Sequence, residues 1–323
     1  MGAVFRLDAD HSLKVYESIL DLIASPSNPS PMVRLSKSSP NSNFELFAKL
    51  EWFNPFGSIK DRPALNMFLQ AEQEGKLNGK SIVEPSSGNT GLALAGIAAK
   101  KGVDLVVTVP SEVPEEKKIL IRLLGAKVED VPDSLCPANP KDGAIALANA
   151  YATSPKFEGK YFMPNQYENK NNLIAHYQTT GPEIWKQTKG KITHFFAGIG
   201  TTGTLSGAGK YLKEQNPKVK IIAVEPQKGH HLPGLKNLSE AATPGIYDKS
   251  VVDETIEVSD KEGYDTLRRV MKEEALLAGP TTGAILHAAL QTAREEQEGL
   301  GVLISPDSAL KYANYIDKML SEK

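Results

Sequence analysis

The stretch His194-Phe-Phe-Ala-Gly-Ile-Gly-Thr-Thr-Gly-Thr-Leu-Ser-Gly207 begins as an apolar strand, passes through a glycine-rich turn and continues into a helix. Residues 220–225, with the sequence Lys-Ile-Ile-Ala-Val-Glu, form the next predicted strand. Strand, helix and strand in this order build a parallel sheet covered by helices. In open α/β sheets, ligands bind beyond the carboxyl ends of the strands. The stretch therefore predicts an α/β fold and puts a glycine-rich turn where ligands bind.

The same alternation occurs earlier in the chain. Residues 80–85 and 104–110 predict strands, and apolar residues in 92–99 and 119–124 predict the helices that follow them. A polar, proline-containing stretch at 155–164 separates this set from the later one. A chain of 323 residues is long enough for about two domains. We therefore expect two α/β domains, each an open, mostly parallel twisted sheet flanked by helices.

Composition excludes several classes of protein. The 37 basic and 39 acidic residues are interspersed and leave a net charge of −2, so we expect no nucleic-acid or membrane partner. The single cysteine, Cys136, cannot form an internal disulfide, which suits a reducing cytosol. The six histidines, including His176, His230 and His231, show no metal-ligand spacing. With neither a signal sequence nor a long apolar run, a soluble, cytoplasmic protein without a metal is expected.

A first candidate site follows the apolar residues 44–52 and has the sequence Asn54-Pro-Phe-Gly-Ser-Ile-Lys60-Asp-Arg62. Ser58 and Asp61 form a capping pattern that predicts Lys60 in the first turn of a helix. The positive end of the helix dipole favours the neutral amine, which is the form that attacks a carbonyl to make an imine. The alternative is a solvated surface lysine, so this motif needs support from elsewhere in the chain.

A second candidate site joins a strand to a helix and has the sequence Glu84-Pro-Ser-Ser-Gly-Asn-Thr-Gly91. Its hydroxyl, amide and main-chain N–H groups would surround a helix N-terminus, which is a natural receptor for a carboxylate. The alternative is a set of Asx or Ser/Thr caps that bind no ligand.

The glycine-rich turn quoted above is a third candidate site. Glycine lets the main chain approach a ligand closely, and Thr201, Thr202 and Thr204 add hydroxyls at a helix N-terminus, which favours a phosphate. The turn also contains a dinucleotide-binding pattern, Gly198-x-Gly200-x-x-Gly203 followed by Glu225. An NAD-dependent oxidoreductase is therefore an alternative, although the threonines favour a phosphate monoester over a bridging pyrophosphate.

A fourth candidate site, Ser305-Pro-Asp-Ser308, ends the last predicted strand. A hydroxyl at this end of a sheet can hydrogen-bond a ring nitrogen without protonating it. The alternative is that Ser308 only caps the following helix.

Taken together and in this order, the four stretches resemble those of fold type II pyridoxal-phosphate enzymes, and the cysteine synthase and cystathionine β-synthase family in particular. The resemblance covers nearly the whole chain. It implies that Lys60 forms a Schiff base with pyridoxal 5′-phosphate, that Asn89 contacts the ring hydroxyl and that Ser308 is the partner of the pyridine nitrogen. It implies a phosphate cup of Gly200, Thr201, Thr202, Gly203 and Thr204, in which Thr202 replaces the usual glycine. The implied substrate-binding residues are Ser86, Ser87, Gly88, Asn89, Thr90, Gln166, Gly234 and Lys236.

The resemblance also implies how the domains are arranged. Such enzymes have a fold like that of the tryptophan synthase β subunit and form homodimers. A smaller, mobile domain of residues 45–165 would carry the Schiff-base lysine and the carboxylate loop. A larger domain, residues 1–44 plus 166–323, would carry the phosphate cup.

The implied activity is synthesis of L-cysteine from O-acetylserine or O-phosphoserine and sulfide or another thiol, through an α-aminoacrylate intermediate. Lys60 would move the Cα proton, and Lys236 would bind an anionic leaving group unless it is an ordinary exposed lysine. Cystathionine β-synthase and serine/threonine dehydratase are the alternatives within this class of enzyme. The NAD-dependent oxidoreductase is the alternative outside it, followed by a non-catalytic binding module.

Overall fold

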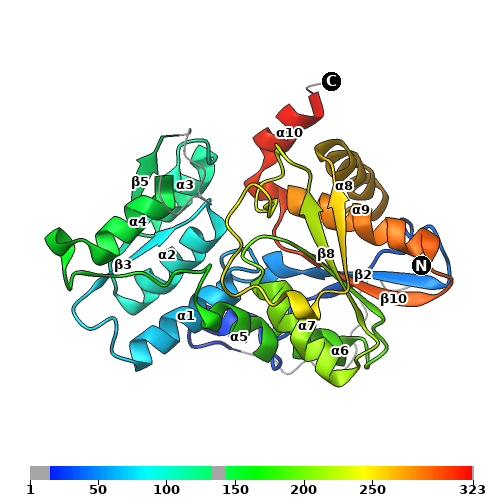
Figure 1. Ribbon diagram of the computed structural model, residues 1–323, viewed down its shortest axis with the longest axis horizontal. Coiled ribbons are helices and arrows are strands. Elements are labelled where there is room, and N and C mark those ends of the chain that lie inside the picture. Colours follow the sequence, from blue (N-terminus) through cyan, green and yellow to red (C-terminus); the bar gives the residue numbers. More distant parts are fainter. Residues whose placement is uncertain (1–14, 133–142, 322–323) are drawn as a thin grey trace.

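The computed structural model describes residues 15–132 and 143–321, and Cys136 lies outside these ranges. Two sheets, one of six strands and one of four, form the centres of two packed units (Figure 1). The expected α/β class with two mostly parallel sheets is confirmed.

The larger unit contains the six-stranded sheet, whose order is β1-β2-β10-β7-β8-β9. Strand β1 runs antiparallel to β2, and the other neighbouring pairs are parallel. The strands are β1 (Met32–Arg34), β2 (Phe44–Leu50), β7 (His194–Gly198), β8 (Lys220–Pro226), β9 (Glu254–Val258) and β10 (Gly299–Ser305). The carboxyl ends of the parallel strands therefore lie along one edge of this sheet.

Side chains of the central strands alternate between two buried faces. In β8, Ile221 and Ala223 pack on one side, whereas Ile222 and Val224 pack on the other. Helices α6 (Thr180–Gln187) and α7 (Gly203–Gln215) cover the first side, and α8 (Asp260–Glu274) and α9 (Pro280–Glu295) cover the second. Burial on both faces explains why these strands are continuous apolar runs in the sequence.

The smaller unit contains a parallel sheet with the order β5-β4-β3-β6. Its strands are β3 (Ser81–Pro85), β4 (Leu105–Pro110), β5 (Lys127–Val131) and β6 (Tyr161–Phe162). Helices α1 (Asp61–Gln73), α2 (Asn89–Lys101) and α3 (Glu115–Leu123) cover one face, and α4 (Gly143–Thr153) covers the other.

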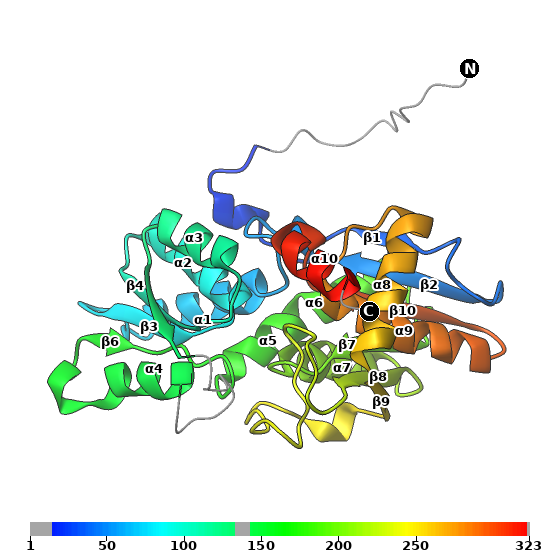
Figure 2. The ribbon, with the colours of Figure 1, turned by 90° about the horizontal axis from the view of Figure 1, so that it is seen from above.

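Two further helices complete the described fold. Helix α5 (Lys170–Gln178) packs against both α1 and α7, and α10 (Ala313–Ser321) ends the described chain (Figure 2). Short 3₁₀ helices occupy Ile19–Leu22, Glu51–Phe53, Pro155–Phe157, Lys249–Val251 and Ala309–Lys311.

The expected start of the smaller domain at residue 45 does not coincide with the sheet boundary. Strand β2 pairs in parallel with β10 and so belongs to the six-stranded sheet. Ile59 packs into the core beneath α6 and α7, and its N–H donates to the carbonyl of Pro306 at 2.9 Å. The segment leading to Lys60 is therefore attached to the larger unit, because strand pairing and apolar burial both hold it there.

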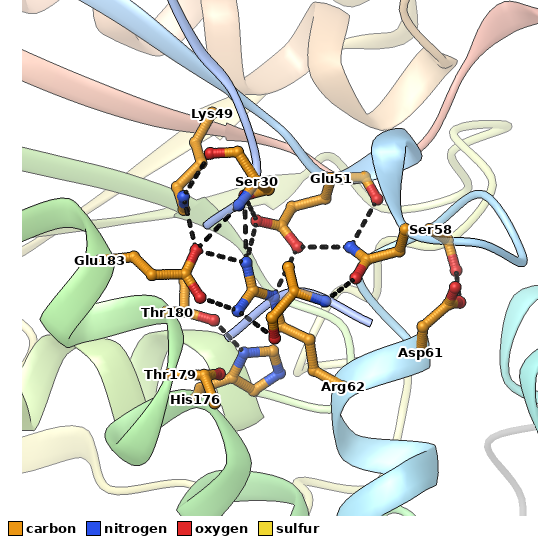
Figure 3. Close-up of polar contacts among 12 residues, drawn as sticks. Ser30, Lys49, Glu51, Ser58, Asp61, Arg62, His176, Thr179, Thr180 and Glu183 are labelled. Atoms are coloured by element: carbon orange, nitrogen blue, oxygen red, sulfur yellow. Dashed lines mark hydrogen bonds and ion pairs between the residues drawn. The ribbon is translucent and has the colours of Figure 1, made fainter. Parts of the chain in front are cut away.

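A buried network of charges also attaches the start of α1 to the larger unit (Figure 3). The Arg62 guanidinium donates to Glu51 Oε2 at 2.7 Å and to Glu183 Oε2 at 2.8 Å. Lys49 Nζ lies 2.8 Å from the same Glu183 oxygen. All four side chains are buried, and buried charges persist only when they are paired and hydrogen-bonded. The network therefore fixes Arg62, two residues after Lys60, relative to β2 and α6.

Candidate active site

A cavity of about 840 Å³ lies between the units and is lined by residues at the carboxyl ends of strands from both sheets. This volume suits a small ligand together with a cofactor, for which sites span roughly 300–1,000 Å³. It is lined by residues from all four predicted stretches, among them Lys60, Ser86, Ser87, Asn89, Thr90, Gln166, Gly200, Thr201, Thr202, Thr204, Gly234, Lys236 and Asp307. Of the predicted site residues, Gly88, Gly203 and Ser308 do not contribute to the lining.

Lys60 is the N-cap residue of α1, two positions earlier than the second helical position where a cap at Ser58 would have placed it. The Ser58 hydroxyl accepts from Lys60 N at 3.2 Å and lies 3.4 Å from Asp61 Oδ1. Among the described residues, the Lys60 amine has no hydrogen-bond or ion-pair partner. Burial lowers the pKa of Lys60, although the carboxylate of Asp307 acts in the opposite direction. The amine is therefore biased toward its neutral, nucleophilic form.

Residues 86–90, here called the serine loop, connect β3 to α2. The Ser86 hydroxyl accepts from Gly88 N at 3.1 Å and from Gly91 N at 2.9 Å, so this side chain shapes the loop. The Thr90 hydroxyl donates to Gln166 Oε1 at 2.7 Å, and Gln166 Nε2 donates to the Pro85 carbonyl at 3.0 Å. Gln166 is thus coupled to the serine loop, although 76 positions separate it from Thr90.

Residues 200–204, here called the threonine cup, connect β7 to α7. Thr202 has φ +66°, a left-handed conformation that glycine adopts more easily. The main-chain N–H groups of Thr201, Thr202 and Thr204 have no acceptor among the described residues. Unpaired donors at a helix N-terminus form a receptor for an anion such as phosphate. The threonine at position 202 therefore keeps the cup's backbone geometry, at the expense of local strain.

Two residues behind the cup were missed in the sequence. Asn172 Nδ2 donates to Thr201 Oγ1 at 3.1 Å, and a Cβ on Gly203 would lie 2.1 Å from Asn172 Oδ1. His176 Nε2 lies 3.4 Å from Thr204 Oγ1, and its Nδ1 lies 2.9 Å from Thr180 Oγ1. Both are on α5, far from the cup in sequence, and no local motif marked them. Burial, followed by the charges of Arg62 and Lys60, lowers the pKa of His176 to about 3, and the ring is neutral.

The predicted role of Ser308 conflicts with its position. Its hydroxyl donates to the Leu277 carbonyl at 3.0 Å and accepts from Leu310 N at 3.3 Å, so it caps a 3₁₀ helix outside the cavity. The preceding residue, Asp307, lines the cavity in its place. Its Oδ2 accepts from Asn89 Nδ2 and from the Tyr312 hydroxyl, each at 2.6 Å. Its buried Oδ1 has no partner among the described residues.

The match to known families agrees with this geometry. A family model described as pyridoxal-phosphate dependent enzyme matches residues 23–307. The chain belongs to the pyridoxal-phosphate dependent enzyme family. Its cofactor is therefore pyridoxal phosphate, and the glycine pattern at 198–203 does not mark a dinucleotide site.

Similar members of this family include cysteine synthases. A protein named cysteine synthase from Aquifex aeolicus (strain VF5) is 42% identical over 308 residues, covering 93% of this chain and 91% of that protein. Cysteine synthase B of Escherichia coli (strain K12) is 36% identical, with 87% and 91% covered. The solved structure of O-ureido-L-serine synthase aligns with a TM-score of 0.86 at 33% identity, covering 96% and 98%. Cysteine synthase (OASS) from Entamoeba histolytica aligns with a TM-score of 0.85 at 29% identity, covering 98% of each chain.

The residues of this family member fit the cofactor chemically. The Lys60 amine and the main-chain donors of the threonine cup have no partner within the described ranges, and they suit the aldehyde and the phosphate respectively. The orphaned Oδ1 of Asp307 suits a further hydrogen-bond donor.

The described residues contain no cluster of three or more His, Cys, Asp or Glu side chains able to hold a metal ion. No helix in 15–132 or 143–321 combines the length and apolarity that a membrane span requires.

Proposed function

We propose that the protein is a cysteine synthase, which replaces the β-substituent of an activated serine, O-acetylserine or O-phosphoserine, by sulfide. One observation carries the proposal: the amine of Lys60, which has no partner in residues 15–132 and 143–321, lines the same cavity as the serine loop and the threonine cup. The cysteine synthases among the similar proteins support this choice of reaction.

Lys60 has two tasks in this proposal. The bound cofactor supplies an electron-withdrawing ring that makes the substrate's Cα–H acidic. Lys60 would hold the cofactor through its Nζ, and the same Nζ, once free, would accept the substrate's Cα proton and later return it. The lowered pKa of Lys60 increases the neutral fraction available to accept that proton.

The serine loop would bind the substrate carboxylate. It lies at the N-terminus of α2, where main-chain N–H groups and the helix dipole favour an anion. The Thr90 to Gln166 hydrogen bond joins this loop to the segment after β6, so a carboxylate bound here can meet donors from both. The position of the cavity between two units would also limit the access of water to reactive species.

Asp307, and not Ser308, would be the partner of the pyridine nitrogen. Asn89 and Tyr312 hold its Oδ2, and Oδ1 is left for a donor. An acidic partner stabilises a protonated ring nitrogen, whereas a hydroxyl does not. With Asp307 as the partner, the ring would therefore withdraw electrons more strongly than with Ser308 as the partner.

Lys236 is a candidate for contact with an anionic leaving group. Its ammonium lies 4.5 Å from the centre of the Tyr167 ring and lines the cavity. Gly234, with φ +90°, allows the chain to turn in the same loop.

The test is product analysis with the purified holoenzyme. Wild-type protein is offered O-acetylserine or O-phosphoserine with sulfide, with homocysteine or with no acceptor. We expect L-cysteine as the main product, and we expect Lys60→Ala to lower turnover by at least about 10²–10⁴-fold. Cystathionine as the main product would instead identify a cystathionine β-synthase, and pyruvate without an acceptor would identify a dehydratase. Full activity of Lys60→Ala would contradict the proposal.

Assembly and location remain predictions. We propose a cytoplasmic homodimer, on the grounds of the family resemblance and the single cysteine. Light scattering of the purified protein measures its molar mass in solution. A monomer at micromolar concentration would contradict the homodimer.

A further inference from the structure

Lys117 is a buried cation in the cavity to which neither the motifs nor the proposed reaction assigns a task. It lies on α3, lines the cavity and is only 4% exposed. Among the described residues its amine has no hydrogen bond and no ion pair within 4 Å. Its neighbour Lys118, equally buried, is paired with Asp130 and the Ser111 carbonyl. Buried ammonium groups normally have an anionic or hydrogen-bonding partner. A ligand in the cavity can provide the partner that Lys117 lacks.

The position of the side chain indicates where that ligand binds. A Cβ placed on Gly88 would lie 2.7 Å from Lys117 Cδ, so the lysine stem lies directly on the serine loop. The ammonium then lies 3.7 Å from the centre of the Tyr312 ring. It is therefore held between the start of α2 and the segment after β10.

No carboxylate in the described part of the chain pairs with this ammonium. Asp307 is the carboxylate that acts on Lys117 electrostatically, but its hydrogen bonds come from Asn89 and Tyr312. Burial, with a further contribution from Lys311, lowers the pKa of Lys117 to about 8, although Asp307 opposes the shift. Lys117 is thus mostly charged at neutral pH, with its donors directed at a ring face and the cavity.

We propose that Lys117 binds the α-carboxylate of the amino-acid substrate, together with the serine loop. This inference rests on the proposed function for the class of substrate. The loop contributes partial charges from a helix N-terminus, and Lys117 adds a full charge beside them. The β-substituent is assigned to Lys236, which lines the same cavity and whose ammonium lies over the Tyr167 ring.

Binding measurements can separate the carboxylate from the leaving group. Calorimetric titration of the holoenzyme with L-serine, L-serinamide and O-phospho-L-serine compares wild type with Lys117→Met. We expect the variant to bind L-serine and O-phospho-L-serine at least about tenfold more weakly, since a charged hydrogen bond is lost. Binding of L-serinamide, which has no carboxylate, should change by less than twofold. Lys117→Arg should restore most of the lost affinity.

Three results for Lys117→Met would overturn the assignment: an equal loss of affinity for all three ligands, a loss of affinity for O-phospho-L-serine alone, or no loss of affinity. Lys118→Met serves as the matched control, because it removes a buried lysine of the same helix that does not line the cavity. Melting temperature and cofactor content verify that each variant is folded, and Lys117→Gln replaces Lys117→Met if the latter is not. The titrations contain no sulfur donor and so cannot form L-cysteine. Failure of the proposed reaction would be seen separately, as the absence of L-cysteine in the product analysis.

Discussion

At the scale of single residues, the site depends on which side chain of a short turn faces the cavity. Asp307 and Ser308 are adjacent, yet one lies against Asn89 and the other caps a 3₁₀ helix. A carboxylate and a hydroxyl have opposite effects on a ring nitrogen, because only the carboxylate stabilises its protonated form. The chemistry available to the cofactor therefore changes with an offset of one residue.

Asp307→Ser tests this offset. Loss of a charge-assisted hydrogen bond, worth ~1.5–3 kcal/mol, should weaken cofactor binding by about tenfold or more. With cofactor labelled with ¹⁵N in the ring, the nitrogen resonance should move from a protonated toward an unprotonated position. Ser308→Ala is the control and should leave both measurements unchanged. A resonance that responds to Ser308→Ala and not to Asp307→Ser would restore the role predicted from the sequence.

At the scale of elements, the ends of strands and the starts of helices make the site. The threonine cup and the serine loop each connect a strand to the helix that follows it, and α5 supports the cup from behind. Gly203, the first residue of α7, allows α5 to come close enough for Asn172 to hold Thr201.

Gly203→Ala should therefore disturb the cup. The added Cβ would lie 2.1 Å from Asn172 Oδ1 and displace that side chain, at a cost of ~1–3 kcal/mol. We expect the cofactor dissociation constant to rise by about tenfold, as measured by titration of the apoprotein. Gly209→Ala, on the same helix with its nearest atom at 3.2 Å, is the control. Similar affinities for the two variants would show that Asn172 does not support the cup.

At the scale of the whole molecule, the buried charges around Arg62 connect β2, α1 and α6 across the two units. Removing one partner leaves another charge buried and unpaired, which typically costs ~3–5 kcal/mol.

Arg62→Met should lower the free energy of unfolding by about that amount in urea titrations of the holoenzyme. Arg34→Met breaks the exposed pair with Glu45 and should cost less than ~1 kcal/mol. Equal effects of the two substitutions would mean that the buried network contributes no more than a surface pair.

The same network predicts how stability depends on pH. Burial alone raises the pKa of Glu51, but the charge and hydrogen bonds of Arg62 outweigh it and lower the pKa from 4.5 to about 2. A carboxyl with a lower pKa in the folded state stabilises the protein above the unfolded-state value, and this contribution disappears as pH falls through the folded-state value. We expect unfolding free energy to decrease from about pH 4.5 to pH 2 in wild type, and less steeply in Glu51→Gln. Parallel curves would disprove the assignment.

The sequence by itself determined the α/β alternation, and it marked Lys60 and the two turns proposed to bind ligands. Strands, helix starts and glycine turns depend on residues close together in the chain. Only the tertiary structure decided that β2 belongs to the larger sheet, that Asn172 and His176 support the cup, and that Asp307 faces the cavity. Only the tertiary structure likewise placed Lys117 in the cavity, because the sequence of its helix contains no motif that marks it. These features depend on packing between segments up to hundreds of positions apart, and local patterns carry no information about which side chain such packing turns inward.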